Sequence, residues 1–300
     1  MDFRGLSAFA PTPFVDGAPD EGAFRRIIAG LAASGVDSIG ALGSTGHYAY
    51  LSVEERVRLT RAAVEEAGDV PVLVSIGSPA TRTVLQLAEG VQAAGASGVL
   101  MAPVSYQRLT RAEALGLYRD ACAELSVQLC IYDNPGTTGF TFDDELYAEI
   151  AALEPVASVK IPGVPLGPGE AEARVAQLRA VLPTDVTIGV SGDQSAAAGL
   201  LAGCDAWYSV IAGSLPEASL RLARAAMAGD LEGTRQADAA LSWIWALFTR
   251  RGSARVAAAV ATQLGLGADF LPRPLLPLGA GEQAEVAEAL AALGASGSAR

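Results

Sequence analysis

The first 228 residues alternate between short apolar runs and longer amphipathic segments. Eight runs rich in Val, Ile and Ala are typical of buried strands, and they begin near Leu6, Asp37, Pro71, Gly98, Val127, Val156, Val186 and Ala206. Each run precedes a segment of helical periodicity, at residues 22–33, 53–66, 83–94, 111–124, 142–153, 170–181, 194–202 and 217–227. Strictly alternating strands and helices imply parallel strands, and eight such units suffice to close a barrel.

The pattern therefore predicts an α/β fold, a (β/α)8 TIM barrel with a C-terminal helical extension. We place the barrel at residues 1–228 and the extension at 229–300, where helical periodicity returns at 231–250, 254–264 and 282–293. An open doubly wound sheet is the alternative, but its usual glycine fingerprint is missing from residues 10–14, after the first strand. Residues 294–300 are expected to fray.

Capping residues support these helix boundaries. A hydroxyl residue precedes an acidic residue by three positions at three predicted helix starts, in the pairs Ser52 and Glu55, Thr110 and Glu113, and Thr141 and Asp144. Asp193, which follows the seventh strand, is expected to cap the next helix in the same way. The aromatic residues Trp243, Trp245 and Phe248 fall in the extension, where they favour core packing or a subunit contact.

Composition narrows the possible partners. The net charge of -12 and a pI near 4.6 argue against binding to nucleic acid, which normally requires a basic surface. No apolar run reaches the roughly 18 residues that a membrane span needs. The odd number of cysteines, without metal or redox spacing, and an N-terminus unlike a secretion signal indicate a cytoplasmic protein without disulfides.

Lys160 is the only lysine in the chain, beside 20 arginines. It ends the apolar run that begins at Val156, and Pro162-Gly163 then turns the chain away. Arginine stays protonated at any relevant pH, whereas a buried lysine amine can lose its proton and become a nucleophile. Lys160 is therefore the first candidate for covalent chemistry.

Other candidates follow the same edge of the predicted barrel, because active sites of this fold lie at the carboxyl ends of the strands. Ser44 and Thr45 follow the second strand in a turn whose hydroxyls and N–H groups suit a carboxylate. Tyr132 ends the fifth strand, Ser191-Gly192-Asp193 follows the seventh, and Tyr208 lies on the eighth.

Four of these motifs together resemble the dihydrodipicolinate synthase and N-acetylneuraminate lyase family. They are Gly43-Ser44-Thr45-Gly46, Tyr132-Asp133-Asn134-Pro135-Gly136-Thr137-Thr138-Gly139, Val159-Lys160 and Ser191-Gly192-Asp193, and the similarity runs from about Gly5 to the end of the chain. The resemblance implies a (β/α)8 barrel with C-terminal helices and a homotetramer, a dimer of dimers. It also implies a class I aldolase or dehydratase that needs no metal and no cofactor.

The resemblance assigns a role to each candidate. Lys160 would form an imine with pyruvate or another 2-oxo acid, Ser44 and Thr45 would hold the carboxylate, and Tyr132 would transfer protons. Tyr106 would complete a hydroxyl relay with Thr45, either within its own chain or across a subunit boundary. Gly192 and Tyr208 would line the substrate site, where Tyr208 replaces a customary aliphatic residue and narrows the pocket.

The sequence departs from the family pattern at three places. His47, the only histidine, replaces the usual Glu after the glycine turn; it either supports the turn or contacts the substrate. Thr137 stands where the synthases have an arginine for a second carboxylate, so we expect an aldehyde or sugar acid as the second substrate. The family's Pro-Tyr-Tyr segment reads Pro103-Val104-Ser105-Tyr106, which displaces the tyrosine by one position.

Two other functions remain open. A metal-dependent barrel lyase is disfavoured by the single histidine and by the lack of clustered carboxylates. A barrel that binds a 2-oxo acid as a non-catalytic regulator is the other alternative, because His47, Ser105 and Thr137 all depart from the family pattern.

Overall fold

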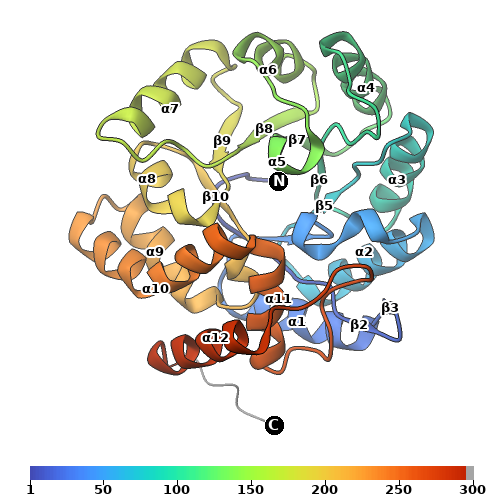
Figure 1. The fold of residues 1–300 in the computed structure, drawn as a ribbon. Coiled ribbons are helices and arrows are strands. Elements are labelled where there is room, and N and C mark those ends of the chain that lie inside the picture. Colours follow the sequence, from blue (N-terminus) through green and yellow to red (C-terminus); the bar gives the residue numbers. More distant parts are fainter. Residues whose placement is uncertain (295–300) are drawn as a thin grey trace.

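Eight parallel strands close into a barrel in the computed structural model, which describes residues 1–294 (Figure 1). Each strand pairs with the next one along the chain, and the last pairs with the first. In order they are β1 (Gly5–Phe9), β4 (Ser38–Ala41), β5 (Val72–Ser75), β6 (Gly98–Met101), β7 (Gln128–Tyr132), β8 (Val156–Ile161), β9 (Thr187–Val190) and β10 (Ala206–Ser209). The predicted barrel is confirmed, and the open sheet is excluded.

A helix follows every barrel strand, and these helices form the outer ring in Figure 1. They are α1 (Glu21–Ala33), α2 (Val53–Ala67), α3 (Thr81–Ala93), α4 (Arg111–Ala123), α6 (Asp144–Ala151), α7 (Glu170–Val181), α8 (Ala196–Leu201) and α9 (Pro216–Met227). Each turns an apolar stripe toward the strands; on α1, for example, Phe24, Ile28 and Leu31 recur at helical spacing and are buried.

Helix starts follow the predicted caps with two exceptions. Ser52 and Thr110 both form complete capping boxes. Thr141 does not cap a helix, because α6 begins at Asp144, two residues after the predicted start, and Asp143 accepts from the N–H of Leu146 instead. The prediction fails because Phe142, counted as helical, packs in the core before the helix, stacked on Tyr147 at 5.1 Å between ring centroids.

Asp193 is the second exception. It belongs to a 3-10 turn, η3 (Asp193–Ser195), and its carboxylate caps neither that turn nor α8. The carboxylate instead accepts hydrogen bonds from Trp207 Nε1 at 3.0 Å and from the N–H of Ile211 at 2.8 Å. A carboxylate this deeply buried needs several donors, and β10 with the turn after it supplies them.

Short elements occupy the loops at the carboxyl ends of the strands. Two-residue strands β2 (Phe14–Val15) and β3 (Ala18–Pro19) pair after β1, and α5 (Pro135–Thr138) follows β7. Three further 3-10 turns are η1 (Ser44–Gly46), η2 (Tyr48–Tyr50) and η4 (Ile211–Gly213). The turns η1 and η2 meet at His47, whose φ of +57° lies in the left-handed region.

Three helices follow the barrel: α10 (Leu231–Arg251), α11 (Ser253–Gln263) and α12 (Ala280–Ala292). Figure 1 shows them over the side of the barrel formed by α8, α9 and α1; α10 packs on α9, and α11 contacts η1. Trp245 and Phe248 are buried in this packing. No helix within residues 1–294 combines the length and apolar character that crossing a membrane would require.

Candidate active site

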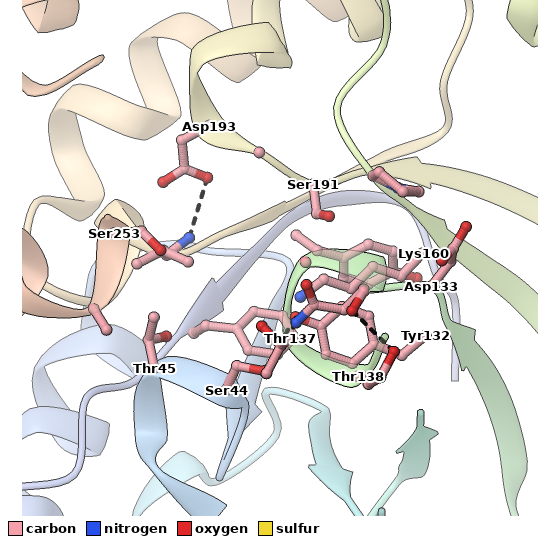
Figure 2. Close-up of a pocket in the computed structure, with 18 of the residues that line it drawn as sticks. Ser44, Thr45, Tyr132, Asp133, Thr137, Thr138, Lys160, Ser191, Asp193 and Ser253 are labelled. Atoms are coloured by element: carbon pink, nitrogen blue, oxygen red, sulfur yellow. Dashed lines mark hydrogen bonds between the residues drawn. The ribbon is translucent and has the colours of Figure 1, made fainter. Parts of the chain in front are cut away.

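A cavity of about 630 Å³ opens at the carboxyl ends of the barrel strands. All but one of the predicted site residues line it: Ser44, Thr45, His47, Tyr132, Thr137, Lys160, Gly192 and Tyr208. Figure 2 shows Lys160 beside Tyr132 and Ser44, with Asp193 and Ser253 on another side of the same hollow. Because these residues come from strands far apart in sequence, closure of the barrel is what brings them together.

Lys160 lies on the inner face of β8, opposite Tyr132 of β7 in the strand register. Its side chain is only 3% exposed, and its Nζ lies 3.9 Å from the ring centroid of Phe9 and 4.3 Å from that of Tyr132. Burial disfavours the charged amine and lowers the pKa of Lys160 from 10.5 to about 8, although the nearby Cys130 and Asp193 oppose the shift. A substantial fraction of the amine is therefore neutral near physiological pH.

The Tyr132 hydroxyl belongs to a small hydrogen-bond network. It lies 3.3 Å from Ser44 Oγ, and the Asn134 amide donates to the Tyr132 hydroxyl at 2.9 Å and to Ser44 Oγ at 3.2 Å. Burial raises the pKa of Tyr132 to about 12, so the phenol is protonated and can donate. Asn134 belongs to the sequence motif that contains Tyr132, but the motif alone assigns it no role. Its position directly before Pro135 is the only local sign that the chain turns there.

His47 lies under the glycine turn, between the cavity and the C-terminal extension. The side chain is buried, and burial lowers its pKa from 6.5 to about 4, although a hydrogen bond with the backbone of Phe270 and the charge of Asp269 oppose the shift. The imidazole is thus neutral at pH 7. The backbone N–H of His47 donates to the carbonyl of Ser44 and closes the turn, and the residue lines the cavity, so contact with a substrate stays a prediction.

Gly192 and Tyr208 shape the wall beside Lys160. Gly192 has a φ of +77°, and a Cβ there would lie 3.2 Å from the backbone of Gly163, so a side chain would be both strained and crowded. The ring of Tyr208 lines the cavity, but its hydroxyl is 2.6 Å from Ser158 Oγ, deeper in the barrel than Lys160. The phenol therefore contributes its ring, and not its hydroxyl, to the site.

Besides Lys160, the described residues that line the cavity include the carboxyl groups of Asp133 and Asp193. Much of the remaining lining is polar but uncharged, with apolar residues between: Thr137, Thr138, Gln194, Thr249, Ser253, Val210, Phe248 and Leu275. Lys160 is the only Lys or Arg among the described residues that line the cavity. Nothing in the sequence indicates that Phe248, Thr249 and Ser253 of the extension reach the site, because helical periodicity does not determine where a helix docks.

Tyr106 is the predicted residue that the fold does not bring to the cavity. It lies in the loop between β6 and α4, is 95% exposed, and is absent from the cavity wall. The proposed relay with Thr45 is not assembled within a single chain.

A metal site would need several ligating side chains close together. Within residues 1–294, the His, Cys, Asp and Glu side chains form no group of three or more that could hold a metal ion. The predicted independence from metal stays a prediction.

Known proteins of similar sequence and structure share this architecture. The sequence profile of the dihydrodipicolinate synthetase family matches residues 2–293. The 4-hydroxy-tetrahydrodipicolinate synthase of Xanthomonas campestris pv. campestris is 34% identical, with 94% of this chain and 92% of that protein aligned. The synthase of the same name from Stenotrophomonas maltophilia strain K279a is 31% identical, with 95% and 94% aligned.

A solved structure gives the same assignment. The crystal structure of dihydrodipicolinate synthase from Agrobacterium tumefaciens strain C58 superposes with a TM-score of 0.94 at 44% identity, over 97% of this chain and 98% of that one. The family profile, the sequence matches and the structural superposition agree. The chain therefore belongs to the dihydrodipicolinate synthetase family, whose members are lyases.

Proposed function

We propose that this protein is a lyase that forms an imine between Lys160 and pyruvate or another 2-oxo acid. The observation that carries the proposal is a buried primary amine, its pKa lowered to about 8, next to the Tyr132 phenol at the mouth of the barrel. A neutral amine is the form that attacks a ketone, and a dry site keeps part of Lys160 in that form.

The chemistry requires one covalent bond to the enzyme. The Nζ lone pair of Lys160 adds to C2 of the 2-oxo acid, and the ketone oxygen leaves as water after protonation. When a proton or a carbon fragment leaves C3, the cationic imine accepts the electron pair of the broken bond. In the reverse direction this pair returns to C3 and forms the new bond to the proton or the carbon fragment. Tyr132 supplies and removes protons, while Ser44 and Thr45 hold the carboxylate.

The lack of a second cation among the described residues that line the cavity bears on the second substrate. Thr137 offers a hydroxyl where the synthases of the family have an arginine, and the wall beyond it contains hydroxyl and amide groups without a cation. A second carboxylate would be poorly stabilised there. We therefore propose an uncharged aldehyde as the aldol partner, or a single sugar-derived 2-oxo acid, whose one carboxylate lies at Ser44 and Thr45, as the substrate of a cleavage or dehydration. We do not expect synthesis of 4-hydroxy-tetrahydrodipicolinate.

The exposed position of Tyr106 fits a role in a neighbouring subunit. We propose a homotetramer, built as a dimer of dimers, in which Tyr106 of one chain completes the hydroxyl relay with Thr45 of another. Tyr106→Phe would then slow proton transfer without affecting a separated monomer. Sedimentation at increasing dilution, run in parallel with activity, tests whether the relay depends on assembly.

Trapping of the imine tests the central proposal. The protein is incubated with pyruvate and reduced with borohydride, and the adduct is located by intact mass and peptide mapping. Because the chain has a single lysine, an adduct can form only there or on the α-amino group of Met1, provided that any tag lacks lysine. Lys160→Arg is the matched control, since it keeps the positive charge but cannot form the imine.

The results separate the possible functions. An adduct on Lys160 that is lost in Lys160→Arg supports the imine; an unmodified Lys160 at saturating pyruvate rejects it. An adduct without turnover of any 2-oxo acid in a broad panel would instead favour a non-catalytic regulator on the same barrel.

A further inference from the structure

Three aromatic rings surround the amine of Lys160. The distances from Nζ to the ring centroids are 3.9 Å for Phe9, 4.3 Å for Tyr132 and 5.6 Å for Tyr208. All three fall within the ~6 Å at which the negative face of a ring attracts a cation, and the attraction strengthens when water is excluded. Tyr132 already has a proposed role in proton transfer, whereas Phe9 and Tyr208 have no role in the mechanism so far.

Two glycines make room for these rings. Phe9 lies against Gly40, its partner in the register of β4, and a Cβ at Gly40 would lie 2.6 Å from the Phe9 ring. Tyr208 lies against Gly189 of β9, where a Cβ would lie 2.1 Å from its ring. Each ring can reach the centre of the barrel only because the neighbouring strand has no side chain at that point.

Contacts deeper in the barrel also hold the Tyr208 ring in place. Its hydroxyl is 2.6 Å from Ser158 Oγ, and Cys130 Sγ lies 3.6 Å from the same hydroxyl. Ser158 is two residues before Lys160, so both side chains point inward from β8. The rings of Phe9 and Tyr208 meet edge to face, with 6.2 Å between their centroids. The two rings thus have little freedom to move away from the amine.

We propose that Phe9 and Tyr208 form an aromatic seat that stabilises the positive charge on the imine nitrogen of Lys160. The inference rests on the proposed function, because it concerns the intermediate formed there. When the neutral amine adds to the ketone and water leaves, nitrogen keeps one hydrogen and gains a positive charge inside the barrel. The ring faces then replace the water that would otherwise stabilise that charge.

Aliphatic side chains in these positions would have a different effect. Leucines would also exclude water, which favours the neutral amine before reaction, but they would penalise the cationic imine by the same physics. Aromatic rings exclude water and still attract the cation through their quadrupole. The same rings attract an ammonium, so they offset part of the cost of burying a charge in either state, and relative to the neutral amine they stabilise the cationic imine.

Fluorination of Phe9 tests this seat with little change of shape. Incorporating mono-, di- and trifluorinated phenylalanine at position 9 weakens the negative ring face stepwise. The equilibrium constant for the pyruvate imine is measured from the fraction trapped by borohydride at about one pH unit above the Lys160 pKa, where the free amine is neutral. We expect a graded fall of about tenfold across the series, the size of a desolvated cation–ring attraction.

The same fluorinated residues at Phe24 are the matched control, because Phe24 is a buried phenylalanine on α1, outside the barrel. A flat series at position 9, or an equal fall at position 24, would overturn the aromatic seat while leaving the imine itself in place. If the natural protein forms no adduct with pyruvate, the result contradicts the proposed function itself and, with it, the aromatic seat. Tyr208→Leu gives a second measurement: an imine equilibrium equal to that of the natural protein would remove Tyr208 from the seat.

Discussion

Replacing Lys160 with methionine should stabilise the folded protein while it abolishes imine formation. The folded state must bury a charged amine at low pH, and this cost appears as the lowered pKa. A pKa that falls from 10.5 to about 8, at about 1.4 kcal/mol for each factor of ten, gives a cost of about 3 to 4 kcal/mol at pH 7. Methionine has a similar length, fills the same space between Phe9 and Tyr132, and carries no charge.

The pH dependence of this effect has a definite sign. Well below pH 8 the amine is protonated in both the folded and the unfolded chain, so the full cost is present. Between pH 8 and 10.5 the unfolded chain binds more protons than the folded one, so the stability of the natural protein rises with pH. The advantage of Lys160→Met should therefore shrink steadily across this interval.

Urea unfolding at a series of pH values, with protein concentration held constant, measures the difference between the two proteins. Titrating groups that do not interact with Lys160 act equally in both chains and cancel. The exceptions are Cys130 and Asp193, because the charge of Lys160 lowers the pKa of each. Lys160→Gln is the control, because it removes the charge but keeps a polar side chain. It should be more stable than the natural protein but less stable than Lys160→Met. A Lys160→Met protein that is less stable at pH 7, or whose advantage does not change with pH, would refute the account of Lys160 as a desolvated amine.

Three further predictions follow from single contacts. The one histidine gives one set of ring signals in NMR, and His47 should titrate near pH 4 because burial lowers its pKa; a midpoint near 6.5 would contradict this burial. Asn134→Ala removes the donor to Tyr132 and should slow turnover of a 2-oxo acid about tenfold with little change in KM, as measured by steady-state kinetics. Asn134→Asp keeps the size of the side chain but loses the donor, so it should slow turnover by a similar factor. Asp143→Ala should lower the free energy of unfolding by about 1 kcal/mol in urea titrations, whereas Thr141→Ala should change it little; the reverse order would restore the capping box predicted at Thr141.

Local features of the sequence determined most of the architecture. The helix predicted at residues 170–181 matches α7 at both ends, and the capping boxes at Ser52 and Thr110 mark true helix starts. These signals depend on side chains within one or two turns of each other, so they survive without knowledge of the tertiary structure. The one lysine, at the end of an apolar strand, likewise marked the centre of the candidate site before any geometry was known.

The tertiary structure decided which residues meet around that lysine. The local sequence around Asp193 predicts a helix cap. Its carboxylate instead accepts hydrogen bonds from Trp207 on β10 and from Ile211 just after that strand. Phe9 and Tyr208 reach Lys160 because glycines on neighbouring strands leave space, and Ser253 reaches the cavity because α11 docks on η1. Such contacts depend on strand register and on how distant helices pack, and neither is encoded in the residues next to them in sequence.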